Sequence, residues 1–410
     1  MMFSSKVFRT SAWSCLALAI WASVATAAEP TFRSELVFPL HKQHNHAPGI
    51  AELPTGDLLI SWYRGSGERK ADDVAIFGSV QKKGQTTWGE TFLMVDTPGF
   101  PDGNTALHVD SQNRLWLIWP LVIANTWESC VPSYLIADKF DEKGQPVWSK
   151  PGTIWLKPDD FNEEGQQGLV EFVKRSVQEK PLTEEQKAKL VIFRERLADK
   201  LYQRLGWQVR CKPTVLPSGR MILPLYSDTY SFSLMAISDD NGATWKASKP
   251  LMGFGNIQPT VLRRDDGTLV TYMRENGPVH KIRVAESKDE GMTWGPVGNL
   301  PIPNPGAGVD AVRLQNGHWF LVYNDQTDGR NSLAVSISTD EGRSWTDPSG
   351  KNPNTKTRHL EHQPTGSFHY PAVIQSKDGL IHVVYSYFVD EGKSMKHAVF
   401  NEEWVGAESK

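Results

Sequence analysis

One eight-residue pattern, Ser-x-Asp-x-Gly-x-Ser/Thr-Trp, constrains the fold of this chain more than any other feature. Its three copies begin at residues 238, 287 and 338, so they are 49 and 51 residues apart. Residues 79–88 resemble a fourth, weaker copy. A nearly constant period of this length is typical of repeat architectures, in which each repeat is one supersecondary unit packed against its neighbours.

A second element recurs with the first: a short apolar run, a turn containing Gly or Asn, and another apolar run. Each copy predicts a β-hairpin. The six copies span residues 47–62, 104–119, 212–226, 258–273, 309–323 and 370–387. Each Asp-containing motif follows a hairpin and lies between two further short strands. Four strands per repeat and six repeats predict an all-β fold, a six-bladed β-propeller.

The two ends of the chain predict how the ring closes. After the last hairpin only one more strand, within residues 395–404, follows, so the last blade is one strand short. Residues 32–40 form an unassigned strand that precedes the first hairpin. We predict that this strand completes the sixth blade, which joins the ends of the chain and removes exposed sheet edges.

Two segments lie outside the β pattern. Residues 1–27 read as a secretory signal peptide, with a positive start, an apolar stretch too short to span a bilayer, and small residues before the cleavage site. Residues 160–206 instead have helical periodicity and predict a helical insertion between blades two and three. We therefore expect a secreted or periplasmic protein whose residues 28–410 form one propeller domain.

Composition excludes several classes of partner. The net charge is −3 and no basic tract indicates nucleic acid. No later apolar run is long enough to span a membrane. No zinc-ligand spacing is present, so we expect no metal and no cofactor, and we expect a monomer. Outside the signal segment the chain has Cys130 and Cys211, which either pair or stay as free buried thiols.

Propeller geometry decides which residues can share a pocket. In each blade, the start of the first strand and the end of the second meet on one face. The Asp-containing motif, between the third and fourth strands, lies on the opposite face. We therefore expect its three aspartates to close turns and its three tryptophans to pack between blades, without a catalytic role. These residues are Asp240, Asp289, Asp340, Trp245, Trp294 and Trp345.

The other face gathers arginines, histidines, tyrosines and carboxylates, which suits an anionic, hydroxyl-rich ligand. First-strand starts supply His44, His46, Asn104, Arg210, Lys212, Asn256, Gln258, Asp310, His369 and Tyr370. Second-strand ends supply Arg64, Glu68, Asp72, Asp73, Asp228, Tyr230, Arg274, Glu275, Asp325 and Arg330. The helical insertion emerges on this same face, where we expect it to wall or cover the pocket.

The repeats resemble the Asp-box (BNR) repeats of the sialidase, or neuraminidase, superfamily, over nearly the whole chain after the signal except 160–206. The resemblance implies a glycoside hydrolase in which three arginines hold a carboxylate, a tyrosine is the nucleophile, a glutamate activates it, and an aspartate is the acid/base. Arg274 and Arg330 match the second and third arginines, and Tyr370 matches the nucleophile. Asp72 or Asp73 lies where the aspartate is expected.

Two positions depart from the superfamily pattern. His46 stands where the first arginine is expected, and Gln258 stands where the glutamate is expected. Neutral His lacks the bidentate fork of Arg, and Gln cannot accept a proton. A neutral imidazole can take a proton near pH 7, so His46 is a chemically suitable base for Tyr370. For His44 and His46 a structural role remains the alternative. Arg210, His44, Gln258 and Asp310 complete the substrate-binding candidates.

Three functions follow from these residues. The first is a secreted exo-glycosidase for an acidic sugar, either sialic acid or a uronic acid. The second is a polysaccharide lyase or other uronate-directed enzyme that uses His46 and Tyr370 for proton transfer. The third is a non-catalytic glycan-binding propeller, because a fold does not fix a function. All three take an acidic glycan as partner.

Overall fold

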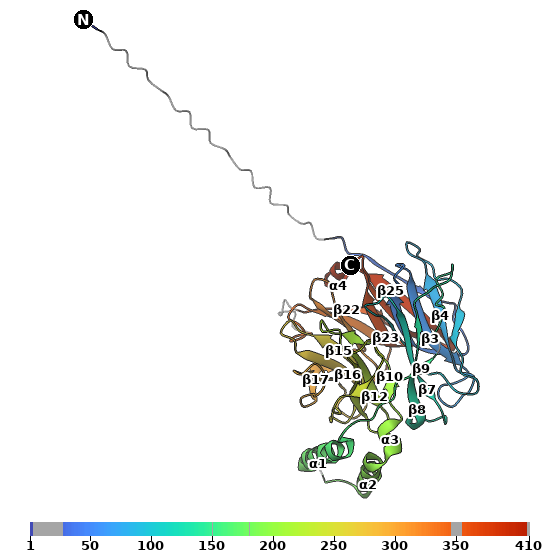
Figure 1. Cartoon of the computed structure of the whole chain (residues 1–410), viewed down its shortest axis with the longest axis vertical. Coiled ribbons are helices and arrows are strands. Elements are labelled where there is room, and N and C mark those ends of the chain that lie inside the picture. Colours follow the sequence, from blue (N-terminus) through green and yellow to red (C-terminus); the bar gives the residue numbers. More distant parts are fainter. Residues whose placement is uncertain (3–27, 150, 180, 346–354, 408–410) are drawn as a thin grey trace.

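The computed structural model describes residues 1–2, 28–149, 151–179, 181–345 and 355–407. Its strands form six sheets, one per predicted blade, so the six-bladed propeller is confirmed (Figure 1). Nearly all of the predicted signal peptide, residues 3–27, falls outside the described residues. None of the helices in the described part of the chain combines the length and the hydropathy needed to span a bilayer.

Each blade is an antiparallel sheet built mostly from strands that are consecutive in the sequence. Blade one contains β2 (His44–Glu52), β3 (Leu58–Gly65), β4 (Ala75–Gln81) and β5 (Phe92–Val95). Blade two contains β6 (Ala106–Val109), β7 (Leu115–Val122), β8 (Cys130–Ala137) and β9 (Gly152–Thr153). Blade three contains β10 (Gln208–Val209), β11 (Thr214–Val215), β12 (Met221–Ser227), β13 (Phe232–Ser238) and β14 (Lys246–Ala247).

The remaining blades follow the same order. Blade four contains β15 (Asn256–Arg263), β16 (Leu269–Glu275), β17 (Lys281–Ser287) and β18 (Gly298–Pro303). Blade five contains β19 (Asp310–Arg313), β20 (Trp319–Tyr323), β21 (Ser332–Ser338) and β22 (Thr355–His362). Blade six contains β23 (Ser367–Gln375), β24 (Ile381–Val389), β25 (Gly392–Phe400) and β1 (Phe32–Leu36). A short helix, α4 (Glu402–Gly406), ends the described chain.

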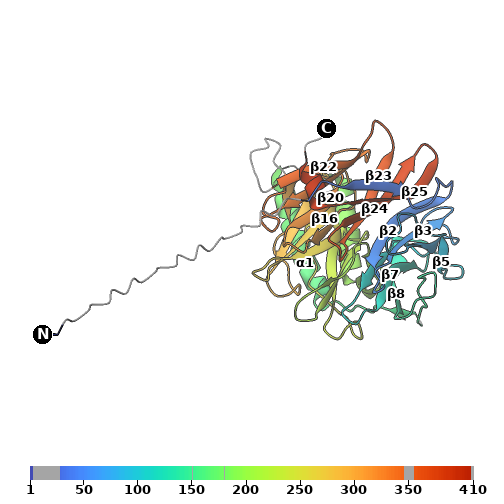
Figure 2. The same ribbon diagram turned by 90° about the horizontal axis from the view of Figure 1, so that it is seen from above.

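The first strand of the chain closes the ring, as the sequence predicts. β1 pairs antiparallel with β25 from Phe32↔Phe400 to Leu36↔Lys396, so the first and last strands of the chain lie side by side in blade six (Figure 2). Glu35 on β1 lies 2.9 Å from the Nδ1 atom of His397 on β25. Trp88, from blade one, donates its indole N–H to the same Glu35 oxygen at 3.2 Å. Glu35 therefore joins blades one and six at the seam.

The hydrophobic core is divided into layers that lie between neighbouring blades. Between blades one and six, for example, Trp62 packs with Val384, Met395 and Phe38. Comparable clusters fill the other five spaces between blades. Apolar residues on both faces of each sheet are buried in this way, which explains the long apolar runs in the sequence.

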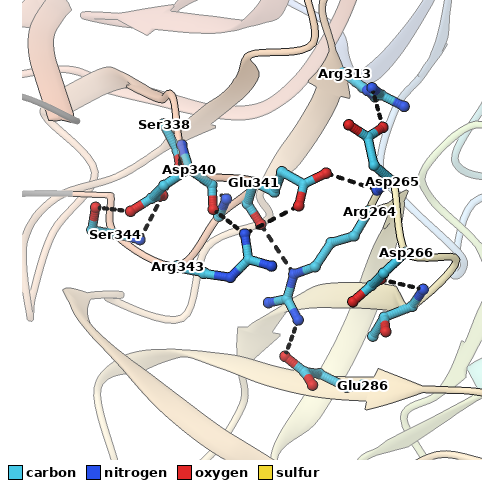
Figure 3. A network of polar contacts seen from close by, with 12 residues as sticks. Arg264, Asp265, Asp266, Glu286, Arg313, Ser338, Asp340, Glu341, Arg343 and Ser344 are labelled. Atoms are coloured by element: carbon cyan, nitrogen blue, oxygen red, sulfur yellow. Dashed lines mark hydrogen bonds and ion pairs between the residues drawn. The ribbon is translucent and has the colours of Figure 1, made fainter.

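The Asp-containing motifs lie between the third and fourth strands and close turns, as predicted. Asp340 accepts hydrogen bonds from Ser338 and from both the backbone and the side chain of Ser344 (Figure 3). Asp240 and Asp289 make the corresponding bonds in blades three and four. Trp345 is buried between blades four and five, where its indole donates to the hydroxyl of Tyr272 at 3.0 Å.

A second set of bonds ties this motif to the neighbouring blade. Arg264, in the turn between β15 and β16, donates to the carbonyl of Glu341 and pairs with Glu286 at 2.8 Å (Figure 3). The amide of Asp265 donates to the Glu341 carboxylate at 2.7 Å. These contacts are structural, and they lie on the face opposite the candidate site.

The insertion between blades two and three is helical, as predicted. It contains α1 (Phe161–Glu179), α2 (Glu184–Ala198) and α3 (Lys200–Arg204), which gather at one end of the molecule (Figure 1). Phe161 and Leu197 are buried against Tyr230 and Phe232 of blade three. The root of the insertion is thus part of the core between blades two and three.

Both cysteines of the described chain are unpaired. Cys130 and Cys211 are buried free thiols, which decides the alternative that the sequence left open. Burial raises the pKa of Cys130 well above its ordinary value and that of Cys211 to about 12. Neither thiol is therefore a ready nucleophile.

Candidate active site

Three first strands share a backbone irregularity that aims side chains toward the axis. Ala47, Gln258 and Tyr370 each precede a proline and have φ between +52° and +55°. In β2, β15 and β23 the strand register shifts at this point, as in a β-bulge. A positive φ at a non-glycine residue costs on the order of 1–3 kcal/mol, so the surrounding structure must hold it in place. Strain of this kind clusters at functional sites.

A cavity of about 230 Å³ opens on the predicted face of the propeller. It brings together groups from blades one, two, three, four and six. Its lining residues are His46, Tyr63, Glu68, Asn104, Trp127, Tyr226, Asp228, Gln258, Arg274 and Tyr370. Seven of these residues are ones that the sequence placed on this face: His46, Glu68, Asn104, Asp228, Gln258, Arg274 and Tyr370.

The phenol oxygen of Tyr370 is the centre of this arrangement. Nη1 of Arg274 donates to it at 2.8 Å, and Nε2 of Gln258 lies 3.0 Å from it. The guanidinium carbons of Arg210, Arg274 and Arg330 lie 5.2, 5.9 and 5.9 Å from the centre of its ring. Three cations around one phenol, of which Arg274 lines the cavity, favour an anionic ligand there.

Arg274 is available to a ligand. Tyr370 is its one hydrogen-bond partner among the described residues, and its Nε atom is buried without a partner. By contrast, Arg283 in the same blade uses both of its Nη atoms, which donate to the Glu275 carboxylate and to two backbone carbonyls, although its Nε atom also lacks a described partner. A guanidinium with free donors at a cavity wall is suited to bind a carboxylate through two parallel bonds.

His46 lies directly against the tyrosine. Its ring centre is 4.2 Å from that of Tyr370, and its Nδ1 atom is 2.8 Å from the hydroxyl of Ser386. Burial lowers the pKa of His46 well below its ordinary value, and the charges of His369, His44 and two nearby arginines act in the same direction. His46 is therefore neutral at physiological pH, with its Nε2 atom free of described partners.

Two carboxylates line the cavity, and their environments push their pKa values apart. A hydrogen bond from His44 lowers the pKa of Glu68, against the opposing effect of burial. Burial raises the pKa of Asp228, although a bond from Gln208 and the charge of Arg274 partly offset it. Opposite shifts in neighbouring carboxylates are the usual sign of a base and an acid in one site.

Asp72 and Asp73, predicted as the acid/base pair of candidates, do not line the cavity. Asp73 caps the turn after β3 by accepting bonds from the backbone and hydroxyl of Ser66. Asp72 accepts a bond of 2.7 Å from Asn125 of blade two. The geometry therefore separates both from Tyr370, and Glu68 of the same loop reaches the cavity instead.

The other predicted binding residues stand behind the cavity wall. Asp310 is buried in an ion pair with Lys212 at 2.9 Å and accepts the backbone N–H of Val373. His44 pairs with Glu68 at 3.3 Å. Arg330 lies beside Tyr370, but its Nη2 atom donates to the carbonyl of Gly306 at 2.7 Å.

Three lining residues were missed by the sequence argument: Tyr63, Trp127 and Tyr226. Tyr63 donates to Glu68, and Tyr226 shares Gln258 with Tyr370. Both tyrosines lie near the end of a second strand, so the strand pattern contained a signal. Arg64, named instead of its neighbour Tyr63, points between blades toward Phe38 and Phe77.

The helical insertion lies on the same face as the cavity without lining it. Phe172 of α1 packs on Phe254 with 4.6 Å between ring centres, and Tyr230 donates to the carbonyl of Arg196. None of the described residues of α1, α2 or α3 contributes to the cavity wall. The expectation that the insertion walls or covers the pocket is therefore wrong for this structure.

We expect the substitution Arg210→Ala to act mainly by lowering stability, with only a small effect on substrate affinity. Arg210 is 2% exposed and donates to the carbonyls of Pro48 and Pro371, so it joins blades one and six through blade three. Losing charged hydrogen bonds to two buried carbonyls should lower the free energy of unfolding by roughly 3 kcal/mol. Denaturant unfolding measures this loss.

Arg313→Ala is the matched control for Arg210. Arg313 pairs with the exposed Asp265, and exposed ion pairs contribute about 1 kcal/mol or less. Unchanged stability together with a large rise in KM for Arg210→Ala would instead show that Arg210 contributes to substrate binding.

Comparisons with known proteins agree with this fold. Residues 56–383 match the family described as BNR repeat-like domain. No curated protein matches the sequence. Among solved structures, a protein of unknown function from Dyadobacter fermentans is 15% identical, with a TM-score of 0.64, covering 90% of this chain and 99% of that one.

Two sialidase structures are similar to the same extent. The NanB sialidase from Streptococcus pneumoniae is 13% identical, with a TM-score of 0.63, over 90% of this chain and 71% of that one. The intramolecular trans-sialidase from Ruminococcus gnavus is 13% identical, with a TM-score of 0.64, over 89% of this chain and 96% of that one. At this identity the likeness concerns the fold. The family match covers well over half of the sequence, and the chain therefore belongs to the BNR repeat-like family.

Proposed function

We propose that this protein is a secreted exo-glycosidase that acts on an acidic sugar, sialic acid or a uronic acid, at the end of a glycan. The observation that carries the proposal is the contact between Arg274 and the phenol of Tyr370 inside the cavity. It joins a free carboxylate-binding group to a nucleophile of the kind that sialidases use. The polar, tyrosine-rich lining also suits a ligand with many hydroxyl groups.

Four cavity groups then have roles in the reaction. Arg274 holds the carboxylate of the sugar, and the charge of Arg330 behind the cavity wall supports it. The oxygen of Tyr370 attacks the anomeric carbon, and neutral His46 takes the phenol proton. Asp228, whose raised pKa favours the protonated form, gives its proton to the leaving oxygen. Water then releases the sugar from Tyr370.

One observation favours a second candidate, a uronate-directed lyase. His46 is neutral and lies against Tyr370, so the two could remove and deliver a proton next to a carboxylate held by Arg274. A lyase leaves an unsaturated sugar that absorbs in the ultraviolet, whereas a hydrolase does not.

The test is a turnover screen on matched pairs of glycosides that differ only in the acidic group, with analysis of the products. We expect release of the acidic sugar without ultraviolet absorbance and no turnover of the neutral partner. An unsaturated product would favour the lyase. Retained binding without turnover of any acidic glycoside would contradict both enzymes and favour a glycan-binding propeller.

The pH dependence of turnover tests the acid. A general acid must be protonated, so activity should fall as the pH rises through the pKa of Asp228, which burial places above its ordinary value of 3.8. Asp228→Asn removes the proton donor. We expect this variant to lose roughly 10²–10⁴-fold in kcat and to lose that limb of the pH profile.

Stability separates this role from a structural one. Because the pKa of Asp228 is raised in the folded state, its contribution to stability is lost as the pH rises through that pKa. Asp228→Asn should therefore keep or increase the free energy of unfolding at neutral pH while turnover falls. A variant that loses stability together with activity would contradict the assignment.

A further inference from the structure

A second groove lies at the root of the helical insertion, outside the cavity. It has a volume of about 630 Å³ and is formed by the segment after β9 and by α3. Trp155, Leu201 and Leu205 make its apolar floor. Trp155 is 71% exposed and Leu201 is 54% exposed, which is unusual for side chains of this size. We call this site the Trp155 groove.

Three cations border this floor: Lys157, Lys200 and Arg204. None of them forms an ion pair or side-chain hydrogen bond with a described residue. By contrast, Lys187 and Lys189 of α2 pair with glutamates of the same helix. The nearest carboxylate along α3, Asp199, is committed to capping that helix through the N–H of Leu201.

An exposed indole between unpaired cations has a defined ligand chemistry. The C–H groups on one face of a sugar ring are apolar and can cover the face of Trp155, which makes no ring contact with a described residue. Carboxylates on the same sugars can pair with the lysines and the arginine. A neutral or purely apolar partner would leave the three cations without a negatively charged partner.

The Trp155 groove is separated from the cavity by one short turn. Leu205 of the groove precedes Gly206, whose N–H donates to the carbonyl of Cys130 at 2.9 Å. A Cβ atom added at Gly206 would lie 3.3 Å from the Cα atom of Glu128, so the two backbones are close together. Trp127, next to Glu128, lines the cavity. The backbone path from Leu205 to Trp127 is thus roughly 12 Å at most, from the usual spacing of consecutive residues. An oligosaccharide of a few sugars spans such a distance.

We propose that the Trp155 groove binds an acidic oligosaccharide chain through Trp155 and the three cations. This site binds whether or not the cavity catalyses a reaction. Where the cavity holds a chain end, the groove holds sugars farther along the same polymer.

Binding of polysaccharides to the full protein tests the proposal. The probes are polygalacturonate and polysialic acid, with dextran as the neutral polymer, and the Tyr370→Phe background prevents turnover during titration. We expect at least one acidic polymer to bind and dextran not to bind. Trp155→Ala and the double variant Lys200→Glu/Arg204→Glu should each weaken binding at least about tenfold.

Matched controls separate a built site from general charge attraction. Lys187→Glu/Lys189→Glu makes the same charge change on α2, where both lysines are paired with glutamates. Ile192→Ala removes an apolar side chain that is 50% exposed on the same helix. Both controls should bind like the parent protein. Equal losses in the controls, or unchanged binding in Trp155→Ala, would overturn the proposal.

The outcome is independent of the proposed reaction. If the Trp155 groove does not bind acidic polymers, turnover of short acidic glycosides is unaffected, because these substrates occupy only the cavity. Failure of the reaction leaves polymer binding and its dependence on Trp155 intact.

Discussion

Replacing Tyr370 with Phe should abolish turnover of acidic glycosides and spare their binding. The change removes one oxygen, the acceptor of the bond from Arg274, and leaves the ring that packs against His46. Loss of a nucleophile should reduce kcat on the order of 10³-fold or more. Because Arg274 keeps its charge and gains a free donor, affinity for an anionic sugar should be maintained. Steady-state kinetics and direct titration with the released sugar measure the two effects separately.

Tyr226→Phe is the matched control. Tyr226 lines the same cavity and shares Gln258 with Tyr370, but no arginine donates to its hydroxyl among the described contacts. The Tyr226 hydroxyl shares hydrogen bonds with Asn104, Gln208 and Gln258, none of which has a reacting atom in the proposed reaction. We therefore expect less than about a tenfold loss of kcat for this variant. Full activity of Tyr370→Phe would remove the tyrosine from the mechanism, and both the hydrolase and the lyase proposals would fail with it.

Gln258→Glu should raise turnover. Nε2 of Gln258 already lies 3.0 Å from the phenol oxygen, so a carboxylate of the same shape would face the proton that must leave Tyr370. Burial makes His46 a weak base, whereas general-base assistance by a well-placed group contributes about 10²–10⁴-fold. The three guanidinium groups around Tyr370 offset the added negative charge. We expect kcat to increase by about 10²-fold, with a new loss of activity as the pH falls and protonates the new carboxylate.

Gln208→Glu controls for the added charge. Gln208 forms hydrogen bonds with Asp228 and Tyr226 and none with Tyr370. A carboxylate at position 208 therefore cannot accept the proton of the Tyr370 hydroxyl. A gain in Gln208→Glu equal to that in Gln258→Glu would show that charge alone is responsible. No gain in Gln258→Glu would mean that proton removal from Tyr370 does not limit the rate.

The blades could be predicted because their signals are local. The spacing of the Asp-containing motifs and of the six hairpins depends on residues within one repeat, and each strand of a hairpin pairs with its neighbour. The closure of the ring by β1 could also be predicted by counting strands. Blade six lacks one strand in the repeat pattern, and one strand at the start of the chain has no other place.

The carboxylates of the site were not predictable in the same way. The position of Asp72 and Asp73 after a second strand predicts which face of the propeller they lie on. It does not predict the direction of their side chains, which depends on their hydrogen-bond partners. Asn125, from the next blade, holds Asp72, and Ser66 holds Asp73. Glu68 reaches the cavity through His44 and Tyr63, and Asp228 reaches it from blade three.

The sequence by itself therefore determined the number of blades, the structural role of the Asp-containing motifs and the meeting of Arg274 with Tyr370. The tertiary structure alone decided which of the rim carboxylates join them, that Arg210 and Asp310 make buried contacts between blades, and that the insertion stands beside the cavity. The physical reason is the range of the contacts. Strand and turn preferences act over a few residues. Two of the rim side chains are instead held by partners more than fifty residues away, as in Asp72 with Asn125 and Arg210 with Pro371.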